Sequence, residues 1–208
     1  MTKSRLIIVC GIPGAGKSTL ARRVVERWGG VSFASETFAA QLGDAARTAS
    51  GDLSKQAIVH AYAAMGTAAA AALAVNKLVV AVGSFRSEEQ RRRFWDLGIA
   101  AGAKVTILRV MCPLVTAAER IRSRFATGER GPGELALLHI EAELNQASDI
   151  DIVLRNDSSM ERLHRLVDAL IELLQSDSST AAIKQRIEWL AKEEPTVARD
   201  FVERTTCN

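Results

Sequence analysis

Short apolar segments alternate with longer segments of helical periodicity along most of this chain. Five segments are typical of buried strands: Arg5–Cys10, Val31–Ala34, Leu78–Val82, Val105–Val110 and Ile150–Leu154. Helical periodicity predicts helices over Lys17–Trp28, Gln56–Val75, Glu88–Ala101, Pro113–Phe125 and Ser158–Leu174. Strands and helices that alternate in this way form βαβ units, in which helices cover both faces of a parallel sheet. The sequence therefore predicts an α/β fold built on a parallel sheet.

The chain of 208 residues is long enough for one domain of ordinary size and a short extension. A polar break at Gln175–Ser179 separates the two, so we expect a domain at residues 1–175 and a helical extension at residues 176–208. The extension has an apolar face, formed by Ile183, Ile187 and Leu190. Because an exposed face of this kind invites association, we expect it to pack on the domain or on a second subunit, which would make a homo-oligomer.

The composition restricts the partners and the compartment. Lys and Arg number 27, and Asp and Glu number 24, so the formal net charge is only +3. A nucleic-acid partner usually needs a larger patch of one sign, so we expect none. The three cysteines, Cys10, Cys112 and Cys207, lie far apart and lack the CxxC spacing of a zinc site. Free thiols are typical of the reducing cytoplasm, which is where we expect the protein.

The alanine-rich stretch Ala61–Val75 is the one candidate in the sequence for a membrane-spanning segment. It is shorter than the ~20 apolar residues needed to cross a membrane, and Gly66 and Thr67 interrupt it. Since alanine is the best helix former, we expect a tightly packed helix of the domain and no membrane contact. We also expect no secretion signal, because the first apolar run is short and is followed by Gly-Ile-Pro-Gly.

A glycine-rich segment, Gly11–Ser18, lies between the first expected strand and the first expected helix. Its sequence, GIPGAGKS, matches G-x-x-x-x-G-K-[ST], the Walker A pattern for binding nucleotide phosphates. Glycines let backbone N–H groups curl around phosphate oxygens, and the following helix directs its positive end at the same anion. We expect Lys17 to reach the β- and γ-phosphates and the Ser18 hydroxyl to bind Mg²⁺. The residues predicted to bind the nucleotide here are Gly11, Pro13, Gly14, Ala15, Gly16, Lys17, Ser18 and Thr19.

Four segments carry a family resemblance: GIPGAGKSTLARRV, LVVAVGSFRSEEQRRRFWDLGIAAGA, RVMCPLVTAAERIRSR and DIVLRNDSS. With them the chain resembles the small P-loop kinases over about Arg5–Leu174, in particular the zeta-toxin-like, gluconate-kinase-like and polynucleotide-kinase-like proteins. The resemblance implies the P-loop NTPase fold, a five-stranded parallel sheet in the order 2-3-1-4-5 with a helical lid. It also implies ATP as the phosphoryl donor and a hydroxyl-bearing acceptor.

Arg120 and Arg124 lie four residues apart on the expected Pro113–Phe125 helix, so both guanidinium groups can project to the same place. They lie beside an expected apolar face, formed by Leu114, Ala118, Ile121 and Phe125. Cations so placed stabilise the charge that spreads over a transferred phosphoryl group. In similar kinases an R-x-x-x-R helix opens the lid, and the segment Gly128–Gly133, which carries Arg130, resembles the tip of that lid. The alternative is a solvated arginine face.

Glu36 follows the second expected strand, where similar kinases carry an acid that accepts the acceptor hydroxyl's proton or helps to hold Mg²⁺. The alternative is a glutamate favoured at a helix N-terminus, with Ser35 as the N-cap. The family usually has Asp here and Arg three residues on, whereas this chain has Glu36 and Ala39. The third strand ends in Val82, where Walker B strands typically end in an acid. Either Glu36 supplies the missing carboxylate or the metal site is weakened.

Three further residues follow the ends of expected strands. Arg86 follows the third strand, and ligands of parallel sheets bind outside the carboxyl ends of the strands, so we expect it to bind an anionic substrate. Arg91 matches the position of a recurrent arginine in the resembled family, which implies a second substrate contact. Asn156 follows the last strand, and we expect it to lie beside the adenine of ATP.

These observations favour an enzyme that uses ATP and Mg²⁺ to phosphorylate a hydroxyl of a small molecule, a sugar or a nucleotide. Two alternatives remain open. One is a nucleotide-binding regulatory module, a degenerate kinase with little turnover, which Val82 favours and the Lys17-Ser18 pair opposes. The other is a zeta-toxin-like or polynucleotide-end kinase, which differs from the first hypothesis only in its acceptor.

Overall fold

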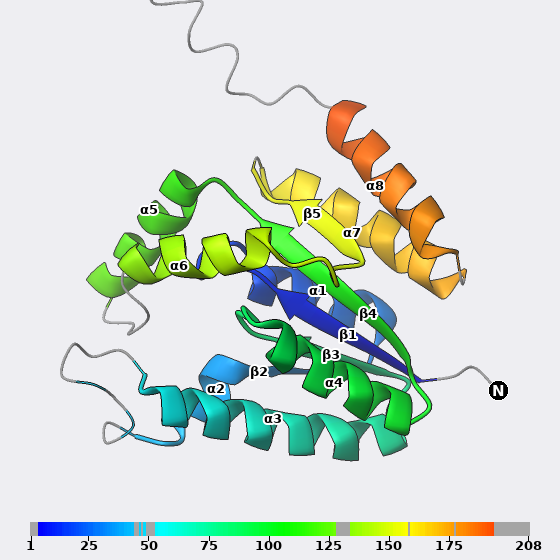
Figure 1. The fold of residues 1–208 in the computed structure, drawn as a ribbon. Coiled ribbons are helices and arrows are strands. Elements are labelled where there is room, and N and C mark those ends of the chain that lie inside the picture. The colour runs from blue at the N-terminus through cyan, green and yellow to red at the C-terminus, as the bar shows by residue number, and fades with distance from the viewer. Residues whose placement is uncertain are drawn as a thin grey trace, which may run out of the picture.

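The computed structural model describes residues 4–43, 46, 48, 53–127, 134–157, 159–176 and 178–193. Five parallel strands form one sheet in the order β2-β3-β1-β4-β5, with helices on both faces (Figure 1). The fold class and the strand order expected from the sequence are confirmed. The strands are β1 (Arg5–Cys10), β2 (Val31–Ala34), β3 (Leu78–Val82), β4 (Lys104–Met111) and β5 (Ile152–Arg155).

The central strand β1 is buried because the run Leu6–Cys10 has no charged or hydrogen-bonding polar side chain. Ile8 lies opposite Ala81 of β3 on one side and Ile107 of β4 on the other. A parallel strand covered on both faces needs such a continuous apolar run.

The last strand, β5, begins two residues later than predicted. Before it, the Asp151 carboxylate accepts a hydrogen bond from the Ile107 N–H at 2.7 Å.

Eight helices lie within the described residues; five of them agree with the predicted helices to within a few residues, and α8 lies in the predicted helical extension. The other two, α2 and α6, were not predicted from the sequence. The apolar spacing of α6 is nevertheless present, because Leu137, Ile140 and Leu144 are its buried residues. The helices are α1 (Lys17–Trp28), α2 (Ser35–Ala40), α3 (Lys55–Val75), α4 (Glu88–Ala100), α5 (Leu114–Ala126), α6 (Glu134–Asn145), α7 (Met160–Gln175) and α8 (Thr180–Glu193).

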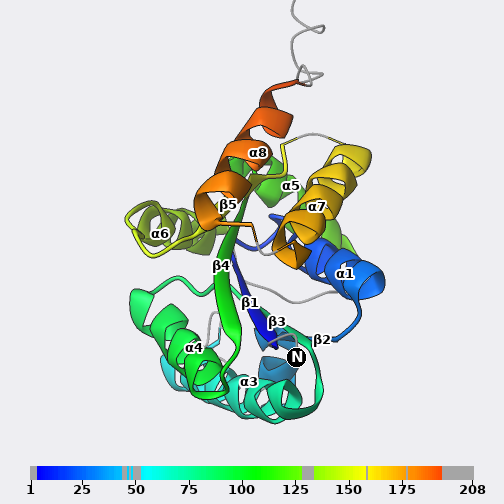
Figure 2. The ribbon, with the colours of Figure 1, turned by 90° about the vertical axis from the view of Figure 1, so that its right-hand side faces the viewer.

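The helices form a layer on each face of the sheet. Figure 2 shows α1 and α7 on one face, with α3 and α4 on the opposite face. Helices α1 and α7 are joined by an ion pair. Nε and Nη2 of Arg23 on α1 donate to the Asp168 carboxylate on α7 at 2.9 and 2.6 Å. This bidentate pair fixes α1, the helix that follows the glycine-rich loop, against α7.

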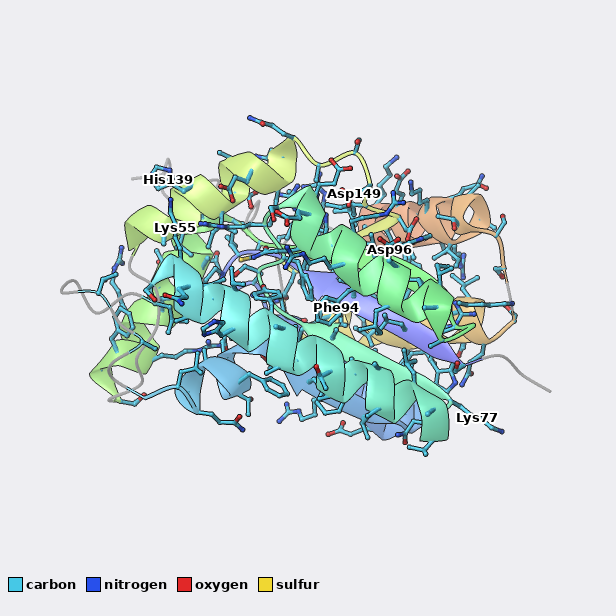
Figure 3. The ribbon with its side chains drawn as sticks, turned by 60° about the horizontal axis from the view of Figure 1, so that its bottom comes forward. Lys55, Lys77, Phe94, Asp96, His139 and Asp149 are labelled. Carbon is cyan, nitrogen blue, oxygen red and sulfur yellow. The ribbon has the colours of Figure 1, made fainter. Side chains whose placement is uncertain are left out.

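By length and composition, α3 is the one described helix that could cross a membrane. In the structure its buried residues, which include Met65, Ala69 and Leu73, belong to the hydrophobic core. Phe94 of α4 packs beside it, and Figure 3 shows this ring between α3 and α4. The helix is therefore part of the packed domain, as the sequence predicted.

The C-terminal helix α8 packs on α7 and β5 of the same chain. Ile183 and Ile187 are buried there, and Leu190 is partly buried. Arg162 of α7 donates through Nη2 to the carbonyl oxygen of Ala191, which fixes the end of α8. The expected apolar face is thus covered within one chain. The boundary between residues 175 and 176 remains a prediction.

All five strands run in the same direction, so their carboxyl ends meet at one edge of the sheet. The glycine-rich loop follows β1, and α2, α4 and α5 follow β2, β3 and β4. In Figure 1 this edge lies on the left, where α5 and the start of α3 are also found. The fold therefore places the glycine-rich loop and the starts of α2 and α5, which carry most of the predicted site residues that the structure describes, at one end of the molecule.

Candidate active site

The segment between β1 and α1 forms a loop with backbone conformations that favour glycine. Gly14 has a φ of +80° and Gly16 a φ of +99°, both in the left-handed region. A Cβ at Gly14 would lie 2.7 Å from the carbonyl oxygen of Ala117 on α5, so a side chain has no room there. The Gly11 N–H donates to the Ser84 carbonyl at 3.3 Å and joins the loop to the segment after β3. This loop has the compact shape of an anion cradle at the N-terminus of α1.

Lys17, the first residue of α1, is only 6% exposed. Its Nζ donates across the loop to the carbonyl oxygen of Ile12 at 2.9 Å. Burial lowers the pKa of Lys17, and the nearby Glu36 carboxylate opposes this shift. The next residue, Ser18, is exposed. The chain thus places a buried ammonium group beneath the loop and an open hydroxyl beside it, as the Walker A pattern requires.

The two arginines of α5 lie next to this loop. Arg120 Nη1 donates to the carbonyl oxygen of Gly14 at 3.0 Å. Arg124 is exposed, and its charge is near enough to Lys17 to lower the pKa of that lysine. Arg120 therefore contacts the loop and the charge of Arg124 lies near Lys17, whereas Arg130 lies outside the described residues. The apolar face of α5 is shorter than expected, because Phe125 is 41% exposed.

Glu36 lies in the first turn of α2, directly after β2, and is exposed. Because Ala34 is paired with Val82, Glu36 lies near the carboxyl end of β3. The interpretation of Ser35 as an N-cap is wrong. Ala34 occupies the N-cap position without a side-chain hydrogen bond, and the Ser35 hydroxyl is instead hydrogen-bonded to Tyr62.

The carboxyl end of β3 carries no acid. Val82 is buried there, and its side chain offers no oxygen to a metal ion. Among the described residues, no group of three His, Cys, Asp or Glu side chains could hold a metal by itself. Ser18 and Glu36 are both exposed at this edge, and a magnesium site usually combines one or two such protein oxygens with waters and substrate phosphates. The residues present therefore fit an ion that arrives with a nucleotide.

The segment after β3 has a strained backbone, since Phe85 has a φ of +42° without being glycine. Its N–H donates to the Tyr62 hydroxyl at 2.9 Å, and its ring packs edge-on against that of Tyr62, with centroids 4.9 Å apart. A Cβ at Gly83 would lie 2.5 Å from the same hydroxyl. Tyr62 of α3 therefore determines the path of this segment, which ends at the half-buried Arg86. Arg86 Nε lies 3.4 Å from the Glu143 carboxylate on α6.

The structure gives Arg91 a different role from the expected substrate contact. The residue is 2% exposed, and four of its five N–H groups are donated to protein acceptors. Nε and Nη2 bind the Asp149 carboxylate at 2.8 and 2.7 Å, and Nη1 binds the carbonyl oxygens of Phe85 and Arg86 at 2.7 and 3.1 Å. Arg91 therefore fixes the strained segment that carries Arg86. Figure 3 shows Asp149 on the loop after α6, near the start of α4.

Asn156 follows β5 and lies against the glycine-rich loop. Its Nδ2 donates to the carbonyl oxygen of Ala15 at 2.8 Å. The sequence predicted that Asn156 lies beside the adenine, whereas the structure places its side chain against the glycine-rich loop. A contact with adenine remains a prediction.

Sequence reasoning missed Arg109, a buried arginine in the middle of β4. Its Nη1 donates to the Leu144 carbonyl at 2.9 Å, and its Nη2 reaches Asn145 Oδ1 at 2.8 Å and Glu141 at 3.0 Å. Arg109 thus attaches α6 to the sheet. The signal was a charged residue inside VTILRV, a run predicted to be a buried strand, because a buried charge needs a partner.

A cavity of about 360 Å³ lies between α3 and α4, away from the glycine-rich loop. Tyr62 and Phe94 form part of its wall, and Glu89 and Arg93 lie at its polar side. Arg93 is ion-paired with Glu89 at 2.5 Å, so this part of α4 is a charge-balanced surface. The cavity does not belong to the site at the strand ends.

Comparison with known proteins identifies the fold family. A family described as AAA domain matches residues 6–149, which is more than half of the chain. A comparison with curated proteins finds no matching sequence. Among solved structures, an APS kinase of Mycobacterium tuberculosis in complex with AMPPNP and APS has a TM-score of 0.59 at 16% identity, with 84% of this chain and 99% of that chain covered.

Two further solved structures have the same fold. A gluconokinase of Sinorhizobium meliloti has a TM-score of 0.59 at 18% identity, with 86% of this chain and 98% of that chain covered. A tunicamycin resistance protein of Deinococcus radiodurans has a TM-score of 0.56 at 21% identity, with 85% and 98% covered. The resemblance to small P-loop kinases is confirmed at the level of the fold. Since the family match includes the glycine-rich loop, Lys17, Glu36 and both arginines of α5, this chain belongs to the AAA domain family.

Proposed function

We propose that this protein is an ATP- and Mg²⁺-dependent phosphotransferase that moves the γ-phosphoryl group of ATP to a hydroxyl of a small molecule, a sugar or a nucleotide. The observation that carries the proposal is the convergence of three cations on one loop. Lys17 lies beneath the loop, and Arg120 and Arg124 approach it from α5. Three cations around a glycine-rich cradle match the charge of a triphosphate and of the transition state for phosphoryl transfer.

In the proposed reaction, the acceptor oxygen forms a bond to the γ-phosphorus while the bond from that phosphorus to the β–γ bridging oxygen breaks. ADP leaves with the bonding electron pair, and the acceptor hydroxyl loses its proton. Lys17 neutralises charge on the β- and γ-phosphates throughout. Arg120 and Arg124, together with Arg130, stabilise the charge that spreads over the transferred group.

Two roles are open to Glu36. As a base it takes the proton of the acceptor hydroxyl, a role worth roughly 10²–10⁴-fold in rate. As a metal ligand, Glu36 would hold Mg²⁺ together with Ser18. The bound ion would neutralise charge on the β- and γ-phosphates. The exposure of Glu36 and its proximity to Lys17 support both roles.

The acceptor is proposed to bind between Glu36 and Arg86, at the carboxyl ends of β2 and β3. Arg86 is half-buried and lies 3.4 Å from Glu143, a loose pair that an anionic group of the acceptor can replace. Arg91 supports this side of the site from behind through its bonds to the carbonyl oxygens of Phe85 and Arg86.

One observation favours a second candidate, a nucleotide-binding module with little turnover. Val82 takes the place of the acid that a Walker B strand usually provides, so β3 would give the metal no carboxylate. The buried Lys17 and the exposed Ser18 argue against this candidate. They are the residues proposed to act on the phosphates and the metal, and both are present in this chain.

Phosphorus NMR separates the two candidates. The full-length protein is incubated with Mg·ATP and a pooled panel of sugars, nucleosides, UDP-sugars and 5′-hydroxyl oligonucleotides. The expected result is a new phosphate ester resonance together with ADP, and division of the pool then identifies the acceptor. ATP that binds in calorimetry but stays intact with every pool would support the regulatory module and contradict the phosphotransferase.

A further inference from the structure

Asn156 has a fixed position at the end of the sheet. It directly follows β5 and is 5% exposed. Its backbone N–H donates to the Met111 carbonyl at 2.7 Å, which continues the pairing of β4 with β5 by one residue. A side chain so enclosed has little surface to offer to an adenine ring, so its contacts with protein groups define its role.

The side chain of Asn156 contacts the loop at one peptide group. Nδ2 donates to the Ala15 carbonyl at 2.8 Å, although the two residues are 141 positions apart. A Cβ at Gly16 would lie 2.4 Å from this Nδ2 atom. The amide therefore fills the space that the missing side chain of Gly16 leaves, and the two residues fit only as a pair.

This hydrogen bond also determines where the next N–H points. The peptide bond between Ala15 and Gly16 is trans, and in a planar trans peptide the C=O and the N–H point in opposite directions. With the Ala15 carbonyl held against Asn156, the Gly16 N–H points away from Asn156. Arg120 holds the preceding carbonyl, that of Gly14, at 3.0 Å. Two consecutive carbonyls of the loop are therefore held by side chains from outside it.

We propose that Asn156 is a positioning residue that keeps the loop in its phosphate-binding shape, so that it acts on the affinity for polyphosphate and not on recognition of the base. This inference rests on the proposed function, because it assumes that the loop binds the phosphates of ATP. Loss of the amide donor leaves the Ala15 carbonyl without its partner, and the peptide then gains freedom to rotate. The loss of one such hydrogen bond corresponds to about a tenfold loss of affinity.

The test compares three ligands by isothermal titration calorimetry: Mg·ATP, inorganic tripolyphosphate with Mg²⁺, and adenosine. Asn156→Leu keeps the approximate shape of the side chain and removes the N–H donor without adding charge, while Asn156→Ala removes both the shape and the donor. The matched control is Asp157→Asn, since the neighbouring Asp157 carboxylate accepts from Arg162 at 2.9 Å and does not contact the loop. Melting temperatures are measured for each variant, and titrations are run well below them.

We expect both Asn156 variants to lose about tenfold in affinity for ATP and for tripolyphosphate, with the affinity for adenosine unchanged and the control like the wild type. A purely structural role would lower the melting temperature without this selective effect. The proposal is overturned if ATP binding weakens while tripolyphosphate binding does not, which indicates a base contact, or if neither changes. A wild-type protein that binds neither ATP nor tripolyphosphate would instead refute the proposed function, and this inference with it. If the alanine variant does not fold, the leucine variant alone decides.

Discussion

The Asp149 carboxylate accepts two hydrogen bonds from the Arg91 guanidinium, at 2.7 and 2.8 Å, although the residues lie 58 positions apart. This pair joins the loop after α6 to the first turn of α4. Arg91 is buried and Asp149 is partly exposed. Because Arg91 also holds the carbonyl oxygens of Phe85 and Arg86, one ion pair connects the loop after α6 to the proposed acceptor side of the site.

Replacing Asp149 with alanine should destabilise the protein, because it leaves the buried Arg91 charge without its partner. We expect the free energy of unfolding to fall by about 3 kcal/mol, measured by urea denaturation. The matched control is Asp96→Ala, whose partner Arg92 lies on the exposed face of α4, and its effect should stay below about 1 kcal/mol. Equal effects of the two substitutions would contradict the structural role of the buried pair.

Replacing Lys17 with alanine should weaken the binding of Mg·ATP or abolish phosphoryl transfer while the fold is retained. The ammonium group lies under the loop and contacts a carbonyl oxygen there, so its removal costs the fold no ion pair. Calorimetry measures the affinity, and far-ultraviolet circular dichroism checks the fold. A folded variant that binds ATP as well as the wild type does would show that the loop is not a phosphate cradle.

Replacing Arg124 with alanine should lower kcat more than it raises KM for ATP, because a lid cation acts mainly on charge in the transition state. The expected loss in kcat is on the order of 10²–10³-fold. The measurement uses the acceptor identified by phosphorus NMR. Arg122→Ala is the control, since Arg122 is also exposed but lies two residues away on the helix, on another side. Unchanged kcat in the Arg124 variant would favour a solvated arginine face.

Deleting residues 178–208 should lower the melting temperature while the affinity for ATP stays within a few-fold of the wild type. The deletion removes α8 and with it the cover that Ile183 and Ile187 give to α7 and β5. Calorimetry and light scattering together measure stability, binding and oligomeric state. A truncated protein with an unchanged melting temperature and mass but no nucleotide binding would show that the extension reaches the active site.

The strands and most helices were predictable from the sequence because burial on both faces demands apolar runs that are easy to recognise. The runs Leu6–Cys10 and Leu78–Val82 are examples, and β3 was predicted with its observed bounds. The helix α6 was not assigned, although most residues of ELALLHIEAELN are apolar and the buried Leu137, Ile140 and Leu144 have helical spacing. Local periodicity thus identified the elements, and the family resemblance supplied their order.

The candidate site was predictable only where its residues are neighbours in sequence or share one helix. Lys17 and Ser18 follow from the Walker A pattern, and Arg120 and Arg124 follow from their spacing on α5. The partner of Arg91 could not be found in this way, because nothing local distinguishes an arginine that binds a distant carboxylate from one that binds a substrate. The contact of Asn156 with Ala15 likewise depends on how β5 lies beside the loop.

The phenol of Tyr62 has a consequence for how the protein should respond to pH. Burial raises the pKa of Tyr62 to about 12, so the phenol keeps its proton throughout the range below about pH 10. Its hydrogen bonds with Phe85 and Ser35 therefore do not change with acidity in that range. The backbone that carries Arg86, and the start of the helix that carries Glu36, are set by a group that does not titrate. A change of rate with pH below that limit would therefore not originate in this phenol.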